Sequence, residues 1–283
     1  MGRLAPLLLN IPVLLLFGVF FAAPLALTGV LSLYGFVSGG TIDDTLTIES
    51  YNDVLLDPYY REVFLRTYLV ALATTMLSVV IGTPEAYVIY RMRPRWRGLL
   101  LLVVIGPLLV SAVIRTFGWM VILGNSGLVN RALMGAGVIE RPLPMMFTSG
   151  AVVLGLVHVL MPFLVLSVWA SLTRLDPALE RAATSLGASR LAVFFCVVLP
   201  NVAPGVLAGS LIVFCMAASS FATPLMLGGK RIPVVSGAIY TEFLSTLNWP
   251  LGAALAIVLL ALNLSLILGY NRFMDRRFVA RLG

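Results

Sequence analysis

Glu85, near the end of one apolar stretch, and Arg115, within another, carry ionisable side chains. Charged groups at membrane depth are costly and usually face protein or water, so both residues are candidates for lining a solute pathway. An alternative for Glu85 is an ion pair with the nearby Arg91 or Arg93, or with a partner subunit. Arg115 would more often brace helices through backbone carbonyls than contact a solute, and it would repel a cation.

Other chemistry is sparse. The chain has one histidine, His158, and two cysteines, Cys196 and Cys215, in 283 residues. A metal site needs a cluster of ligands, and nucleophilic catalysis needs a nucleophile beside its base. We therefore predict no catalytic residue, no bound metal and no cofactor in this chain. His158 follows the small residue Gly155 and is expected to make an interhelical hydrogen bond.

The elements that hold these residues are predicted from composition. Hydrophobic residues make up 60% of the chain and charged residues 11%, a balance that favours lipid as the surrounding solvent. A membrane-spanning helix needs about 20 apolar residues. Six stretches qualify, which predicts an all-α polytopic membrane protein with six transmembrane helices, at about 7–33, 67–90, 98–123, 147–172, 193–225 and 251–270.

The first stretch is longer than the roughly 7–15-residue core of a secretory signal, so we interpret it as a retained anchor helix at 7–33. The remaining spans form a core at about 63–272, interrupted by a polar loop at about 173–200. The whole chain, 1–283, is predicted to be a single membrane domain.

Basic residues predict the orientation. Twelve of the 19 Lys and Arg residues fall in the termini and in alternate loops, whereas eight of the twelve acidic residues fall in the opposite loops. By the positive-inside rule both termini are cytoplasmic. The net charge of +7 is then a topology signal, and we expect lipid contact and no nucleic-acid binding.

The loop at 173–200 contains signals for a short helix from about Pro177 to Leu186. Asp176 is a good N-cap, Pro177 suits the first helical position, and Gly187 is placed to end the helix in a left-handed turn. A second helix is expected to start near Ser189 and to continue to a break at Pro200.

One face of the first helix is an apolar stripe with a methyl-sized centre, formed by Leu179, Ala182, Ala183 and Leu186. The opposite face is polar, formed by Glu180, Arg181, Thr184 and Ser185. Small residues let another protein surface approach closely. The alternative is a helix that lies along the lipid headgroups and stabilises two spans.

The same loop resembles the signature of permease subunits from ATP-binding-cassette (ABC) importers. That signature reads Glu-Ala-Ala, three residues, Gly, nine residues, an aliphatic residue, one residue, then Leu-Pro. Here the matching positions are Ala182, Ala183, Gly187, Val197, Leu199 and Pro200. Arg181 occupies the position of the signature's Glu, with Glu180 one residue earlier, so the resemblance does not carry over an ion pair from that Glu to an ATPase.

Further segments resemble the spermidine/putrescine permeases of this family, and together they cover nearly the whole chain. They are 113–119 with Gly124 and Gly127, 158–163, 221–229, and 248–251. Importers of phosphonates, opines, amino-acid-like solutes or anions share much of this framework, so another cargo is the leading alternative.

The resemblance implies a bacterial inner-membrane complex with several partners: a second permease subunit in a heterodimer, two copies of a cytosolic ATPase, and an extracytoplasmic solute-binding protein. The partner ATPase would bind ATP and magnesium. This chain has no G-x-x-x-x-G-K-[ST] phosphate loop, and its only lysine is Lys230. The docking surface implied for the ATPase is Asp176, Glu180, Arg181, Ala182, Ala183, Leu186 and Gly187.

A polyamine cargo would need carboxylates and aromatic faces for its ammonium groups. Besides Glu85 and Arg115, we therefore expect the pathway to include Trp119, Phe221, Tyr240, Glu242 and Trp249. The alternative for each aromatic side chain is interfacial anchoring or helix packing. An ion-driven secondary transporter is a second alternative, although the chain shows no internal repeat and almost no carboxylate within its spans.

Overall fold

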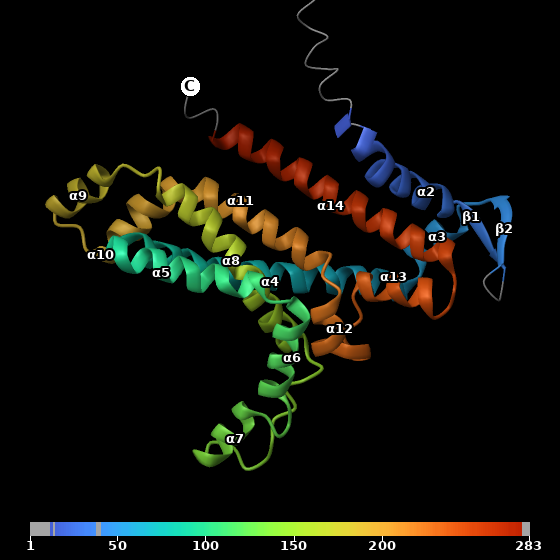
Figure 1. Ribbon diagram of the computed structural model, residues 1–283, viewed down its shortest axis with the longest axis horizontal. Helices are drawn as coiled ribbons and strands as arrows, with labels where there is room; N and C mark the ends of the chain where they lie inside the picture. The colour runs from blue at the N-terminus through green and yellow to red at the C-terminus, as the bar shows by residue number, and fades with distance from the viewer. Residues whose placement is uncertain (1–11, 14, 38–40, 279–283) are drawn as a thin grey trace, which may run out of the picture. The chain divides into compact units, whose positions relative to one another are not determined.

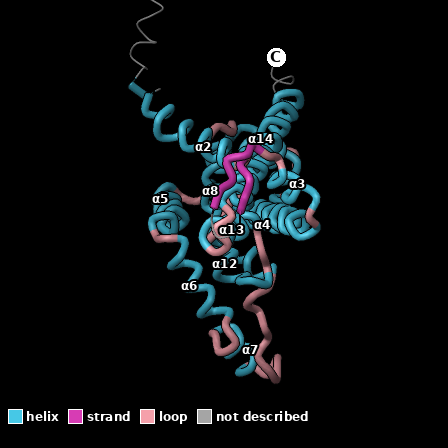
Figure 2. Tube along the Cα trace, turned by 90° about the vertical axis from the view of Figure 1, so that its right-hand side faces the viewer, coloured by secondary structure: helices cyan, strands magenta, loops and turns pink. Residues whose placement is uncertain are grey.

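The structure is a computed structural model that describes residues 12–13, 15–37 and 41–278. Apart from one hairpin, the regular elements of these residues are helices (Figure 1). The hairpin pairs β1 (Tyr34–Val37) with β2 (Thr41–Leu46) in antiparallel register, Phe36 opposite Ile42, and Figure 2 shows it as the strand-coloured segment.

The helices that form or extend the apolar stretches are long, and shorter helices connect them. The long ones are α4 (Pro58–Arg91), α8 (Ser149–Leu172), α11 (Leu199–Ala218) and α14 (Trp249–Phe278). The shorter ones are α2 (Ala23–Leu31), α3 (Glu49–Leu56), α5 (Pro94–Ile105), α6 (Ala112–Leu123), α7 (Leu128–Gly135), α9 (Pro177–Ser185), α10 (Arg190–Val193), α12 (Ala222–Gly228) and α13 (Val235–Leu244). Single turns complete the set: η1 (Gly18–Ala22), η2 (Gly106–Leu109), η3 (Phe194–Val198) and η4 (Gly229–Arg231).

Five segments of the described residues are long and apolar enough to cross a membrane: Pro58–Arg91, Ala112–Gly135, Ser149–Leu172, Arg190–Ala218 and Trp249–Arg272. A shorter apolar helix covers Leu15–Leu31. It lies within the anchor predicted at 7–33, of which residues 7–11 and 14 fall outside the described residues.

Two predicted spans differ from the observed helices. The stretch at 98–123 is interrupted between α5 and α6 by the 3₁₀ turn η2, where Pro107 supplies no backbone N–H. The stretch at 193–225 stops earlier than expected, because α11 ends at Ala218 and α12 begins as a separate helix at Ala222.

The predicted break at Pro200 was wrong. α10, η3 and α11 follow one another without a gap from Arg190 to Ala218. The π-helical turn η3 ends with the Leu199 N–H donating to the carbonyl of Phe194. A π-turn just before Pro200 accommodates a residue that cannot donate its own hydrogen bond, so the helix continues instead of ending.

Contacts group the chain into two compact units. The first contains the described residues up to Phe64 together with Val235–Leu264, and the second contains Leu65–Val234 and the described residues from Ser265 onward. These units are defined by contacts within the chain and do not test whether residues 1–283 act as a single membrane domain. The single domain therefore stays a prediction.

The core of the second unit is α8, which is buried along most of its length, including Leu156, Leu164 and Leu172 with no exposed surface. α11 packs along it (Figure 1). A Cβ added at Gly205 would lie 2.9 Å from the Ser167 carbonyl oxygen, and one at Gly209 would lie 2.9 Å from the Leu164 Cδ1. These two glycines therefore set the close approach of the two helices.

In the first unit, polar contacts tie the hairpin region and helix ends together. The Ser32 and Tyr51 hydroxyls lie 2.6 Å apart. The Tyr60 hydroxyl donates to the Glu242 carboxylate of α13 at 3.0 Å. A Cβ on Gly252 would come within 2.8 Å of the Phe243 ring, so α13 and the start of α14 also approach closely.

Candidate functional site

The predicted loop helix is present as α9, and both of its ends are capped by the expected residues. The Asp176 Oδ1 accepts from the Ala178 N–H at 2.8 Å, and Pro177 is the first helical residue. Gly187 adopts φ +86°, a left-handed conformation that glycine reaches without strain. The Ala188 N–H donates to the Ala183 carbonyl and the Gly187 N–H to the Thr184 carbonyl, which is the Schellman arrangement.

The apolar stripe of α9 is largely uncovered. Leu186 is 89% exposed and Leu179 is 44% exposed, and Ala182 is exposed as well. Ala183 alone turns inward and packs against the core. An amphipathic helix that leaves two leucines in the open has a surface suited to a further protein or to lipid.

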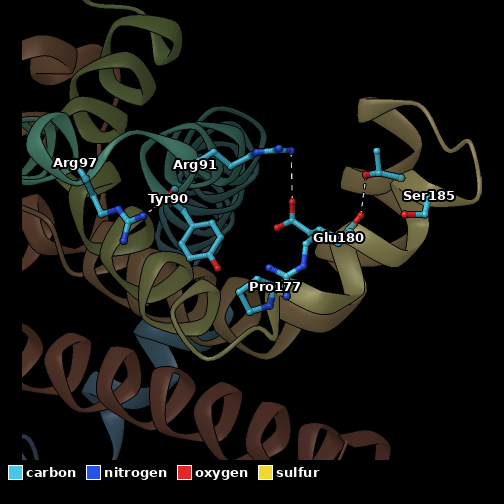
Figure 3. Close-up of a pocket in the computed structure, with 8 residues that line it drawn as sticks. Tyr90, Arg91, Arg97, Pro177, Glu180 and Ser185 are labelled. Carbon is cyan, nitrogen blue, oxygen red and sulfur yellow. Dashed lines mark hydrogen bonds and ion pairs between the residues drawn. The ribbon is translucent and has the colours of Figure 1, made fainter.

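The polar face of α9 is divided between inward and outward residues. The Glu180 carboxylate accepts from the Tyr87 hydroxyl at 3.1 Å and forms an ion pair with Arg91 at 3.4 Å. The Glu180 side chain is 14% exposed, against 50% for Arg91. Figure 3 shows Arg91 reaching from α4 toward Glu180 on α9. Glu180 thus points into this chain rather than outward.

Tyr87 lies at the centre of this group of side chains. Its hydroxyl also accepts from Arg91 Nη1 at 2.9 Å, and the Arg91 guanidinium lies 5.6 Å from the centre of its ring. The ring also packs on Phe194 of η3, with centroids 5.1 Å apart. One tyrosine therefore contacts α9 through its hydroxyl and the π-turn through its ring.

An open depression of about 600 Å³ lies beside α9, lined by Tyr90, Arg91, Arg97, Pro177, Glu180, Arg181, Thr184 and Ser185 (Figure 3). The Arg97 Nη2 donates to the Tyr90 carbonyl at 2.8 Å. Arg181 is exposed, and among the described residues it makes no ion pair or side-chain hydrogen bond. The cationic residue at the signature's Glu position is therefore available to a partner.

Glu85 makes no ion pair with Arg91 or Arg93 in the structure, and Arg91 pairs with Glu180 instead. The Glu85 Oε2 atom is buried without a hydrogen-bond partner among the described residues. Glu85 stays a candidate for the pathway, and the alternative of an ion pair with Arg91 or Arg93 was wrong.

Arg115 and Trp119 of α6 both contact α8. The Arg115 Nη1 donates to the Val159 carbonyl at 3.4 Å, so it braces two helices as its alternative role predicts. The Trp119 Nε1 donates to the His158 Nδ1 at 3.2 Å, with the rings edge to face. The expected interhelical hydrogen bond of His158 is confirmed, and its partner is a residue that we had predicted to line the pathway.

The remaining pathway candidates are spread over both units. Phe221 is half-buried just before α12 in the second unit, whereas Tyr240, Glu242 and Trp249 lie in the first. The Glu242 carboxylate is held by Tyr60 and by the Thr246 hydroxyl at 2.5 Å, and the Trp249 Nε1 donates to the Phe243 carbonyl at 3.1 Å. The predicted pathway made of these seven residues stays a prediction.

Sequence reasoning missed Tyr87 as a partner of the loop helix, and it missed the Gly205 and Gly209 contact. The glycine pair has the small-xxx-small spacing, which could have been found in the sequence. No local pattern marks Tyr87, since it meets Glu180 across 93 positions of the chain.

Comparison with known proteins identifies the family. Residues 86–279 match the family described as "binding-protein-dependent transport system inner membrane component". The chain belongs to this family. This inner membrane component is 35% identical over 235 residues to the spermidine/putrescine transport system permease protein PotB of Haemophilus influenzae, covering 82% of each protein. It is 36% identical over 226 residues to PotB of Escherichia coli, covering 80% of this chain and 82% of that protein.

A solved structure agrees on the fold. A bacterial ABC transporter involved in the import of the acidic polysaccharide alginate aligns with a TM-score of 0.81 at 16% identity, over 97% of this chain and 96% of the other. The inner membrane component therefore has the ABC importer permease fold, and its family is a non-catalytic membrane subunit. The predicted fold class and family are confirmed.

Proposed function

We propose that this chain is the permease subunit of an ABC importer for polyamines of the spermidine/putrescine type. The observation that carries the mechanical part of the proposal is α9, a capped helix whose stripe leaves Leu179, Ala182 and Leu186 exposed. The exposed Arg181 lies beside this stripe. A subunit without a nucleotide site needs an exposed surface to which a separate ATPase can bind. The similarity to PotB over about four fifths of the chain supports the cargo.

The assembly has four kinds of subunit in this proposal. A second, different permease completes the pathway, two copies of a cytosolic ATPase bind ATP and magnesium and grip the docking helices, and a binding protein delivers the solute from outside. Both termini and α9 lie in the cytoplasm, as the basic residues of the inner loops favour. Because Arg181 replaces the signature's Glu, the ATPase groove is expected to offer a carboxylate at this position.

The pathway would use aromatic faces and carboxylates for the ammonium groups of the solute. Glu85 supports this because its buried oxygen has no partner among the described residues. Trp119 is less free for cargo, since its N–H is engaged by His158. The positions of Phe221, Tyr240, Glu242 and Trp249 in the pathway remain part of the proposal.

Reconstitution tests the function directly. We expect proteoliposomes that contain this chain, its second permease and the ATPase to accumulate labelled spermidine or putrescine when ATP and the loaded binding protein are supplied. Omitting the ATPase or the binding protein should abolish uptake.

Other outcomes separate the alternatives. If the binding protein bound another solute tightly and neither polyamine was taken up, the proposed cargo would be wrong and the assignment as an ABC importer permease would stand. Uptake by this chain alone, driven by an ion gradient, would make it a secondary transporter and overturn the proposal.

A further inference from the structure

The contact between α9 and α4 differs from the other attachments of α9. The chain itself joins α9 to α8 on one side and to α10, η3 and α11 on the other. α4 is not joined to α9 by a neighbouring stretch of chain. Among the described residues, Glu180 is the only α9 side chain that makes a hydrogen bond or an ion pair to α4, through Tyr87 and Arg91.

The geometry of this contact allows it to transmit a displacement in two directions. The Glu180 carboxylate is held by two donors, the Tyr87 hydroxyl at 3.1 Å and the Arg91 guanidinium at 3.4 Å. The same hydroxyl accepts from Arg91 at 2.9 Å, which closes a triangle. The Tyr87 ring leans on Phe194 of η3 at 5.1 Å. Movement of α9 therefore acts on α4 through polar contacts and on the π-turn through the shared ring.

The carboxylate of this triangle is more buried than its cation. Glu180 is 14% exposed, so water and salt screen its charge only in part, whereas Arg91 is 50% exposed and is screened more. Three polar groups that satisfy one another also hold a single geometry better than one flexible ion pair.

We infer that Glu180 is a positioning residue that couples the docking helix to α4, while the outward face of α9 binds the ATPase. The inference rests on the proposed function. Displacement of α9 moves α8 and α11 through the chain, and it moves α4 in step only while the Glu180–Tyr87–Arg91 triangle is intact. Loss of the triangle leaves the ATPase bound and hydrolysing, but the helices no longer move together.

Charge exchange tests the inference. Three single variants break the triangle: Glu180→Arg, Arg91→Glu and Tyr87→Phe. The double variant Glu180→Arg/Arg91→Glu restores opposite charges with exchanged positions. In proteoliposomes containing the complete transporter, the measured quantity is solute imported per ATP hydrolysed. We expect about a tenfold fall in each charge variant, a smaller fall in Tyr87→Phe, and substantial recovery in the double variant.

Arg95→Ala is the matched control, because Arg95 is an exposed arginine of the same region that does not line the depression. It should leave the import ratio unchanged. A second measurement, the amount of ATPase that copurifies, should stay at the wild-type level in every variant. Recovery in the double variant would also show that the losses in the two single charge variants do not come from misfolding.

Three results would overturn the inference: an unchanged import ratio in the single variants, no recovery in the double variant, or loss of the ATPase from the complex. The last result would make Glu180 a docking residue. Failure of the proposed function looks different, because the wild-type complex itself would then show no ATP-driven uptake.

Discussion

At the scale of single residues, two adjacent side chains of α9 serve opposite surfaces. Glu180 is turned toward α4, and Arg181 is exposed beside it. In a helix, neighbouring residues differ in direction by about 100°, so one position decides whether a charge faces the chain's own core or a partner. The acidic residue one position before the signature's Glu therefore contacts α4 of this chain, and the signature position itself carries the positive charge of Arg181.

Gly187 gives a residue-scale prediction. Its φ of +86° and the absence of any atom within 4 Å of an added Cβ mean that a substitution there is limited by backbone strain alone. Gly187→Val should cost about 1–2 kcal/mol in the left-handed conformation and tilt the end of α9. We expect the import ratio to fall severalfold. Gly187→Asn, which tolerates this conformation, should retain most of it. Equal behaviour of the two variants would contradict a backbone origin.

The caps of α9 could be predicted from the sequence because each acts within a few residues of itself. The Asp176 side chain accepts a hydrogen bond from a backbone N–H two residues later, and Gly187 adopts the left-handed conformation that ends the helix. The partner of Glu180 could not be predicted, because it depends on how α4 passes the loop. The pairing assigned to Glu85 failed for the same reason, since closeness in sequence favoured Arg91 and the fold gave that arginine to another carboxylate.

At the scale of elements, the second unit depends on the packing of α11 on α8. The Ser167 hydroxyl of α8 donates to the Gly205 carbonyl of α11 at 2.8 Å. This hydrogen bond lies where Gly205 and Gly209, which have no Cβ, allow the two helices to approach closely. In lipid, such close backbone approach replaces the hydrophobic driving force that operates in water.

Gly205→Ala should therefore destabilise the protein. The new Cβ would meet the Ser171 side chain and the Ser167 carbonyl at less than 3 Å, and overpacking of this kind costs about 1–3 kcal/mol. We expect the midpoint of thermal unfolding in detergent to fall by several degrees. Gly118→Ala is the control, because nothing lies within 4 Å of its added Cβ. A fall of equal size in both variants would refute the packing explanation.

Elements were predictable in kind more than in number or continuity, because six spans were predicted and five segments of the described residues are long enough to cross a membrane. Hydropathy located the long helices, since a run of apolar residues identifies a span without knowledge of its neighbours. It could not show that Pro107 divides one stretch or that a π-turn carries the chain past Pro200. Both outcomes depend on whether the freed backbone groups find other partners, and that is decided by the surrounding helices.

At the scale of the whole molecule, the distribution of charge predicts the orientation. Introduced cysteines test it in a variant that lacks Cys196 and Cys215. Ser185→Cys should react with a membrane-impermeant thiol reagent only in inside-out vesicles, and Ser245→Cys only in intact spheroplasts. Both serines are exposed. The reverse pattern would invert the topology and place α9 outside the reach of any cytosolic ATPase.

Composition and one spaced signature were enough to predict the class of this molecule. The cargo was harder to predict, because a permease contributes only part of a pathway and its candidate residues are divided between two units. Relatives named for spermidine and putrescine now support the cargo more strongly than any side chain of this chain does.

The turn between α5 and α6 has a consequence for what can surround the subunit. α5 has 12 residues, a length of roughly 18 Å, so it cannot by itself cross a hydrocarbon layer of about 30 Å. Wherever the backbone at 106–111 lies within that layer, its free peptide groups cannot be left against fatty-acid tails. Another polypeptide or a column of water must border it there, and acyl chains are excluded from it.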